Sequence, residues 1–225
     1  MKLLRQTSVA LAAAAMFGAI PSVVLADALP VGGAIGAPST LTLTPGATLG
    51  SLTSLMTAPT FTATVRTAVQ SGALLGGVAN CAGCLDFFYQ ITINSADDGP
   101  NRTTVTSFAP ATITTNVWQL LNGSVLGLGF VNGTVSGTSA DRFTAAVVGE
   151  NFAANTLVGG TTSLVFVVRT NATEFVPGVF NAIDGSVGSV ASLAPTITPE
   201  PSTAVLLGSG LFGLVGFARR RKNNA

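Results

Sequence analysis

The residues that could carry out acid–base or nucleophilic chemistry are few in this sequence. It contains no histidine, so neither a Ser-His-Asp nor a Cys-His device can be assembled. Lysine occurs only at Lys2 and Lys222, which leaves no activated lysine nucleophile between them. A pair of carboxylates could still cleave a glycosidic bond, and the candidates are Asp86, Asp141, Glu150, Glu174 and Asp184.

These acids have little support from neighbouring residues. Trp118 and Tyr89 are the only tryptophan and tyrosine that could form a platform for a sugar ring. Most of the acids also lie near predicted turns, where a solvated carboxylate is the simpler interpretation. No glycine-rich phosphate loop precedes a helical pattern. We therefore predict no catalytic residues, no cofactor and no enzymatic activity.

Two cysteines form one CxxC sequence, Cys81-Ala82-Gly83-Cys84. In an oxidising compartment this spacing favours a local disulfide. A thioredoxin-like redox pair would need a strand before it and a helix after it, whereas Leu85–Asn94 is strand-like. A zinc site would need two further soft ligands, and the sequence has neither histidine nor a third cysteine. Asp97 and Asp98 lack the spacing of an EF-hand and are interpreted as a turn, so we expect no metal site.

Charge is unevenly distributed along the chain. Residues 27–198 contain eight acids and four arginines, a net charge of −4, although the whole chain carries +1. The positive charges are concentrated near the two ends. Four scattered arginines cannot form a basic face, which argues against a nucleic-acid partner.

The segment between the two ends has the pattern of a β-rich domain. In Leu85–Asn94 apolar residues alternate with polar ones, and Phe88 interrupts the polar face, which predicts cover by a neighbouring element. Ser163–Thr170 is almost entirely apolar before Arg169, as in a central strand that is covered on both faces. Further strands are predicted over Phe61–Val69, Arg102–Phe108, Val117–Leu121, Val125–Val131, Arg142–Val148 and Val187–Leu193.

Turn residues separate these strands. Hairpin turns are predicted at Asn122-Gly123 and Asn132-Gly133, and further turns at Val176-Pro177-Gly178 and Asp184-Gly185. Threonine alternation at Thr40–Thr44 and Thr60–Thr64 could match an ice lattice, but the ordinary β propensity of threonine explains two short runs. We predict a mainly β fold, an antiparallel β-sandwich or jelly-roll-like ectodomain over residues 27–198.

The N-terminal 26 residues have the organisation of a secretory signal peptide. Lys2 and Arg5 form the charged region, and an alanine-rich apolar stretch, Val9–Ile20, comes next. Val24-Leu25-Ala26 offers small residues for cleavage after Ala26. The sequence predicts a signal-peptide helix over residues 1–26 and export of the chain from Asp27 onward.

Residues 199–225 contain three parts in a fixed order. Pro199-Glu200-Pro201 breaks any preceding helix, the uncharged segment Ser202–Ala218 comes second, and Arg219, Arg220, Arg221 and Lys222 come third. At about 1.5 Å per residue the uncharged helix would span roughly 26 Å, close to the bilayer core. The basic cluster would act as a membrane stop signal on the cytoplasmic side. A plain tail anchor is the alternative interpretation.

This three-part segment resembles the PEP-CTERM sorting signal of exported bacterial proteins, a segment also catalogued as the ice-binding protein C-terminal domain. The matching residues are Pro199, Glu200 and Pro201, the glycine-rich run, and Arg219–Lys222. The resemblance implies recognition by an exosortase in the inner membrane and delivery to the cell surface or the extracellular polysaccharide matrix. A looser resemblance to the β-rich ectodomains of such proteins rests on Leu85–Gln90, Arg169–Thr173 and Asp184-Gly185 and implies no activity.

The sequence thus favours an exported surface or matrix protein with a structural or interaction role. Its expected partners are an exosortase, the inner membrane and, as a candidate, exopolysaccharide. The main alternative is a carbohydrate-binding module, with an acid-pair glycosidase as its less favoured form. Either would need a cleft with Trp118 or Tyr89 beside two carboxylates. Ice binding through the threonine runs is a third hypothesis.

Overall fold

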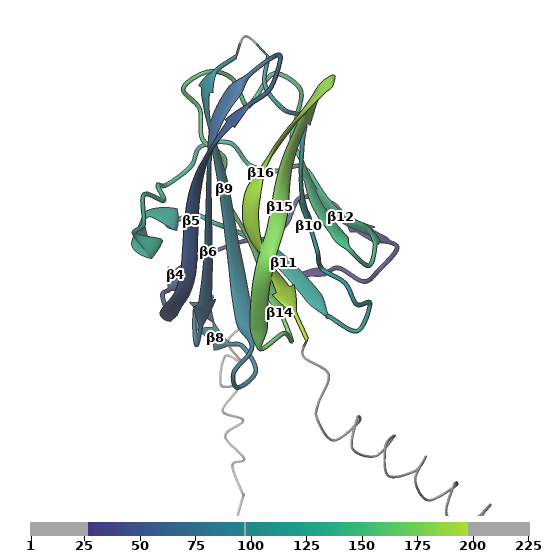
Figure 1. Ribbon diagram of the computed structural model, residues 1–225. Helices are drawn as coiled ribbons and strands as arrows, with labels where there is room; N and C mark the ends of the chain where they lie inside the picture. The colour runs from purple at the N-terminus through teal and green to yellow at the C-terminus, as the bar shows by residue number, and fades with distance from the viewer. Residues whose placement is uncertain (1–26, 97, 198–225) are drawn as a thin grey trace, which may run out of the picture.

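The computed structural model describes residues 27–96 and 98–197, which we call the β domain (Figure 1). The predicted signal peptide, with its cleavage site at Ala26, and the predicted sorting signal over residues 199–225 lie outside the described residues. The mainly β, antiparallel fold is confirmed, and one short 3-10 helix, η1 (Gly123–Leu126), is the only helix within the described ranges. In the part that the structure describes, no helix is both long and apolar enough to span a membrane.

The strands form two large sheets and one small one. The seven-stranded sheet A consists of β1 (Asp27–Ala28), β11 (Thr115–Leu120), β14 (Val165–Thr170), β9 (Leu85–Ser95), β6 (Thr62–Ser71) and β5 (Ala47–Thr57) in spatial order, with β3 (Thr40–Leu41) parallel to β11. The six-stranded sheet B has the order β16 (Ser186–Thr196), β15 (Glu174–Asp184), β10 (Arg102–Thr106), β13 (Val147–Asn151), β12 (Ser139–Thr144) and β2 (Gly33–Ile35). The small sheet contains β4 (Leu43–Thr44), β7 (Leu74–Leu75) and β8 (Val78–Ala79).

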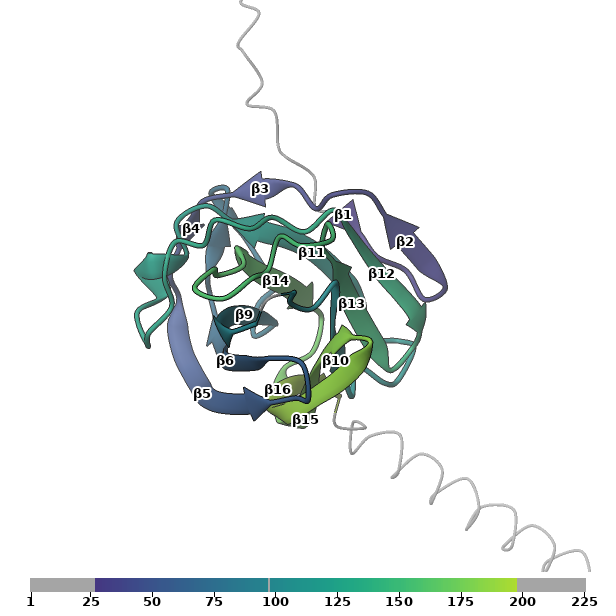
Figure 2. The same ribbon diagram turned by 90° about the horizontal axis from the view of Figure 1, so that it is seen from above.

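Sheets A and B face each other and share one hydrophobic core. Strand β9 shows why, because its alternating side chains Phe87, Tyr89, Ile91 and Ile93 all belong to this core. Val105 of β10 and Phe180 of β15 enter it from sheet B. The view from above shows the strands of both sheets surrounding this interior (Figure 2).

A second core lies on the outer face of sheet A. Phe88 of β9 packs there with Trp118 of β11 and Val167 of β14, under cover of Leu126 and Phe130. This confirms the prediction that a neighbouring element covers Phe88. Every residue of β14 is buried, which also confirms the predicted central strand.

The structure corrects several local predictions. Gly123–Leu126 forms η1, followed by a loop with positive φ angles at Gly127, Leu128 and Gly129, so neither the Val125–Val131 strand nor the Asn122-Gly123 hairpin turn is present. Asn132-Gly133 likewise lies in a loop. Arg142–Val148 is interrupted by a turn at Ala145-Ala146, between β12 and β13.

The predicted turn at Val176-Pro177-Gly178 is instead the interior of β15. Over Glu174–Val179 this strand pairs with β16 alone, since β10 pairs only from Phe180 to Ile183. A proline has no N–H to donate and is tolerated in a strand where one side has no partner. The turn at Asp184-Gly185 is as predicted, with Gly185 at φ +57° between β15 and β16.

Sheets A and B also meet at one pair of edges, where β5 and β16 lie side by side (Figure 2). Ser54 Oγ donates to the Ala191 carbonyl between these two edges. Nearby, the hydroxyls of Thr67 and Ser192 form a buried hydrogen bond. The β8–β9 loop and both ends of the described chain lie toward the lower end of the domain in Figure 1.

Candidate functional site

The candidate carboxylates do not form a catalytic pair in the β domain. Asp141 and Glu150 come from neighbouring strands, but the register pairs Asp141 with Gly149 and Glu150 with Ala140. Ala140 belongs to the core between the sheets, so Glu150 points inward, whereas Asp141 lies on the outer face with Arg102. Two carboxylates on opposite faces of a sheet cannot flank one substrate.

Glu150 is a buried acid that connects the two sheets. Its Oε1 accepts a hydrogen bond from Gln119 Nε2 of β11 at 2.8 Å, and Ser136 Oγ donates to Gln119 Oε1 at 2.6 Å. Burial raises the pKa of Glu150 to about 8, although the hydrogen bond from Gln119 opposes the shift. An adjoining cavity of about 10 Å³, the space of roughly one water molecule, is lined by Tyr89, Thr103 and Phe180 among others.

Asp86 forms an ion pair with Arg169. Arg169 approaches it with Nε and Nη2, at 2.8 Å and 3.1 Å, and the two residues face each other across β9 and β14. Asn80 Nδ2 adds a third hydrogen bond at 3.1 Å. Burial raises the pKa of Asp86, and the contacts with Arg169 and Asn80 oppose this shift. A carboxylate held by three donors is a structural group rather than a free base.

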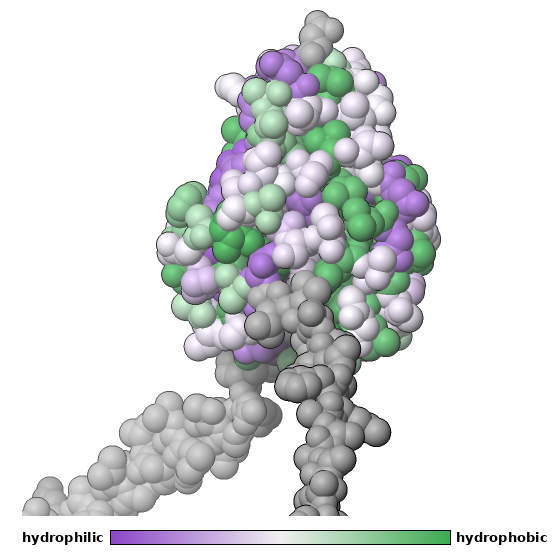
Figure 3. Space-filling view, turned by 180° about the vertical axis from the view of Figure 1, so that it is seen from behind, coloured by the Kyte–Doolittle hydropathy of each residue, from purple (hydrophilic) through white to green (hydrophobic). Residues whose placement is uncertain are grey.

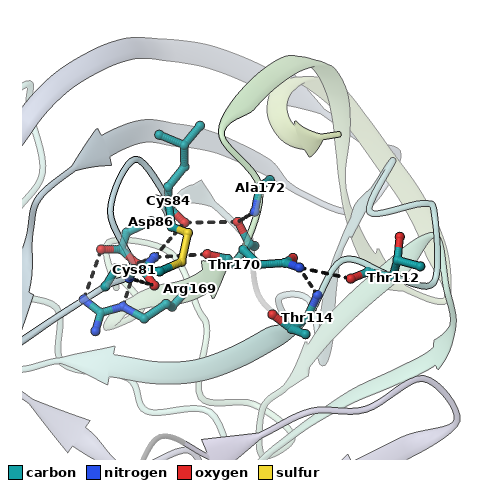
Figure 4. The surroundings of a disulfide bond; sticks show 11 residues. Cys81, Cys84, Asp86, Thr112, Thr114, Arg169, Thr170 and Ala172 are labelled. Atoms are coloured by element: carbon teal, nitrogen blue, oxygen red, sulfur yellow. Dashed lines mark hydrogen bonds and ion pairs between the residues drawn. A yellow bond between two sulfur atoms is a disulfide. The ribbon is translucent and has the colours of Figure 1, made fainter. Parts of the chain in front are cut away.

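The cysteine pair lies directly beside this ion pair (Figure 4). Cys81 and Cys84 are at disulfide distance, with their Cα atoms 5.2 Å apart, in agreement with the predicted pair. Cys84 is buried and is followed directly by β9. A thioredoxin-like redox pair would be followed by a helix, so the position of Cys84 favours the local disulfide. Asn80, which precedes the pair, also donates to the Thr170 carbonyl, so the loop is tied to β14. Leu85–Gln90 and Arg169–Thr173, two of the three segments with the looser resemblance, therefore meet here.

Asp141 has a different set of partners on the outer face of sheet B. Arg102 donates to both carboxylate oxygens of Asp141 in a bidentate ion pair, and Asn151 Nδ2 donates to Asp141 Oδ2 at 3.1 Å. Burial opposes ionisation of Asp141, but the hydrogen bonds from Arg102 and Asn151 outweigh it and lower the pKa of this carboxyl. The ring of Phe143 covers the Arg102 guanidinium at 5.9 Å.

The remaining candidates are spread over the domain. Glu174 and Asp184 begin and end β15, roughly 33 Å apart at the rise of an extended strand. Tyr89 is 1 % exposed and donates its hydroxyl to the Leu193 carbonyl, and Trp118 is 3 % exposed beneath the Arg169 guanidinium. Neither ring is available as a sugar platform. Within residues 27–96 and 98–197, no three His, Cys, Asp or Glu side chains gather as a metal-binding set.

One charged residue that the sequence reasoning did not select is fully buried. Arg142 is 1 % exposed on the inner side of β12, at the wall of a groove of about 610 Å³. Its Nη1 donates to Ile113 O and Thr115 Oγ1, and its Nη2 donates to Phe108 O and Ala145 O. The sequence offered one signal for the burial of Arg142, because a strand places residues two apart, such as Ala140 and Arg142, on the same face. Nothing in the sequence indicated which face of this strand points into the domain.

The segment of this chain that matches a known protein family lies outside the β domain. Residues 198–222 match the PEP-CTERM protein-sorting motif. A search of the curated proteins and of the solved structures finds no match. The motif implies export and sorting to the cell surface through an exosortase. In agreement with the sequence resemblance, the chain carries a PEP-CTERM protein-sorting motif over residues 198–222.

Proposed function

We propose that this chain is an exported, non-enzymatic protein whose β domain is the cargo of its sorting signal. The signal peptide over residues 1–26 starts export, Ser202–Ala218 holds the chain in the inner membrane, and exosortase processing delivers it to the surface or the exopolysaccharide matrix. There the β domain acts as a structural or interaction component. The observation that carries this proposal is the sorting motif over residues 198–222.

The contacts within the β domain support a role without catalysis. Asp86 and Asp141 are engaged by arginines, and Glu150 is enclosed between the sheets. The rear face of the domain mixes hydrophobic with weakly polar residues, and its hydrophilic residues form small separate groups (Figure 3). These features suit a stable, weakly charged module.

The test is cell fractionation of a variant in which Pro199, Glu200 and Pro201 are replaced by alanine. The variant should accumulate in the inner membrane, while the wild-type chain reaches the surface or the medium. Pro59→Ala is the matched control, because Pro59 is exposed in the turn between β5 and β6 and lies outside the signal. An identical distribution of all three proteins would overturn the proposal.

A carbohydrate-binding role through Trp118 or Tyr89 is not supported, since both rings are buried. If the β domain contacts exopolysaccharide, it does so elsewhere on its surface.

A further inference from the structure

The side chain of Gln119 lies between a hydroxyl group and a carboxyl group inside the β domain. Ser136 Oγ donates to Gln119 Oε1 at 2.6 Å. On the other side of the amide, Gln119 Nε2 donates to Glu150 Oε1 at 2.8 Å and to the Gly137 carbonyl at 3.3 Å. The glutamine is 0 % exposed and the acid is 2 % exposed. A nucleophile, an amide carbonyl and an acid are thus placed in the order in which an acyl transfer uses them.

The two other glutamines of the β domain are bonded differently. Gln70 Oε1 accepts from a backbone N–H, and its Nε2 donates to the Thr48 hydroxyl at 3.2 Å, so this hydroxyl meets the amide nitrogen rather than the carbonyl. Gln90 is bonded to backbone N–H and carbonyl groups. The arrangement at Gln119 is therefore a property of this position and not the general way in which the domain buries an amide.

The distances at Gln119 suit a reaction between its neighbours. Its carbonyl carbon is bonded to Oε1, so the hydrogen bond from Ser136 holds Oγ close to the range of about 3–3.5 Å from which attack begins. Burial raises the pKa of Glu150 to about 8, so the acid carries a proton at neutral pH and has one to give to a leaving nitrogen. Ser136 itself is exposed, which provides a short path to solvent for a small leaving group.

We propose that Ser136 and Gln119 form an ester cross-link in the folded protein, with release of ammonia. Ser136 Oγ attacks Cδ of Gln119, and its proton passes to Oε1, which already accepts its hydrogen bond. Glu150 then protonates Nε2, the Cδ–Nε2 bond breaks and ammonia leaves. The proton on Oε1 passes to the Glu150 carboxylate as the carbonyl re-forms, so the acid is restored and no further reactant is needed.

The new bond joins β11 of sheet A to the segment that enters β12 of sheet B. The cysteine pair, in contrast, spans four residues of a single loop and does not connect the sheets. An amide is more stable than an ester, but ammonia takes up a proton in neutral water and diffuses away, which draws the reaction forward. Each chain reacts once, so the protein is modified without turnover. The inference goes beyond the sorting function and does not rest on it.

The test is mass spectrometry of the purified full chain after denaturation and digestion with trypsin. Cleavage after Arg102 and Arg142 releases residues 103–142, a peptide that contains both partners and is not cut further. In the wild-type chain this peptide should be lighter by about 17 Da, the mass of one ammonia. After a chymotryptic cut at Phe130, the fragments that carry Gln119 and Ser136 should stay joined until mild alkali hydrolyses the ester.

Three variants separate the roles of the residues. Ser136→Ala removes the nucleophile and should abolish the loss of mass. Ser124→Ala is the matched control, because Ser124 is another exposed serine of the same peptide, in η1, and this variant should keep the loss. Glu150→Gln keeps the nucleophile but removes the proton donor, and it should yield at most about a tenth of the cross-linked peptide at equal times after refolding.

Three results would overturn the inference. The first is a wild-type peptide of unchanged mass. The second is a loss of ammonia that persists in Ser136→Ala, because it would place the reaction at an Asn-Gly sequence, Asn122-Gly123 or Asn132-Gly133, where a succinimide forms with the same loss. The third is equal cross-linking in Glu150→Gln and the wild-type chain. None of these readouts depends on where the cell delivers the protein, so a failure here is distinguishable from a failure of the sorting proposal.

Discussion

Gln119 of sheet A donates a hydrogen bond to Glu150 of sheet B across the interior of the domain, at 2.8 Å from Nε2 to Oε1. The carboxyl is enclosed, and its pKa is raised to about 8 by burial. The protonated acid thus helps to hold the two sheets together. Gly137 lies against the same pair, because an added Cβ there would come within 2.5 Å of Glu150 Oε1.

Stability should therefore fall as pH rises. Between the ordinary pKa of 4.5 and the folded value of about 8, the folded chain keeps a proton that the unfolded chain has lost. The unfolding free energy should decrease over this window, by at most about 5 kcal/mol, and level off above it. Urea denaturation at intervals from pH 5 to 9 measures the slope.

Glu150→Gln should remove most of that slope, because an amide cannot lose the proton. Asp184→Asn, at the turn between β15 and β16, is the matched carboxylate control and should keep the wild-type slope. A wild-type chain whose stability is constant from pH 5 to 8 would contradict the assignment.

The two ion pairs should differ in their contribution to stability. Asp86→Asn leaves the buried Arg169 without its counter-ion and should cost roughly 3 kcal/mol of unfolding free energy. Arg102 is partly exposed, with 25 % of its side chain accessible, so Asp141→Asn should cost about 1 kcal/mol. Chemical denaturation of both variants provides the comparison, and equal losses would argue against burial as the deciding factor.

Loss of the cysteine pair should be a mild change. A bridge between Cys81 and Cys84 closes a loop of four residues, for which chain entropy gives about 2 kcal/mol. The double variant Cys81→Ala/Cys84→Ala should unfold cooperatively with a stability reduced by no more than this amount. Dithiothreitol should destabilise the wild-type chain and leave the variant unchanged; destabilisation of both would indicate an effect unrelated to the bridge.

Gly133 should not tolerate a side chain. A Cβ at this position would overlap the Ser163 carbonyl, in the loop that leads to the outer core of sheet A. Gly133→Ala should cost about 2 kcal/mol or more, because backbone must move. Gly36→Ala is the control, since no atom lies within 4 Å of its added Cβ. Thermal melts of the two variants should separate clearly, and coincident melting curves would contradict the packing described here.

Strand β9 could be predicted because apolar and polar residues alternate in Leu85–Asn94 everywhere except at Phe88, which matches one apolar and one mostly polar face. Strand β15 could not, because Pro177 and Gly178 are turn residues by local preference. Only the tertiary arrangement, with β16 as the sole partner over Glu174–Val179, makes the proline acceptable. The 3-10 segment was missed since Val125 and Leu126 follow a strand-like hydropathy pattern.

The buried charges were equally hidden from pattern reasoning. In Asp141-Arg142-Phe143, hydropathy favours burial of the phenylalanine and exposure of the arginine. The structure has the reverse, with Phe143 65 % exposed and Arg142 1 % exposed, because the register with Ala140 turns Arg142 inward. The sorting signal, in contrast, could be identified from the sequence, because its three parts are contiguous in the chain and their recognition needs no tertiary structure.

The location of the chain in cells with and without an exosortase tests the sorting account most directly. With the enzyme, the protein should appear in the surface or extracellular fraction with its N-terminus at Asp27, as sequencing of the recovered protein would establish. Without it, the protein should remain in the inner membrane. Recovery of the unprocessed chain from the cytoplasm of both strains would contradict the account.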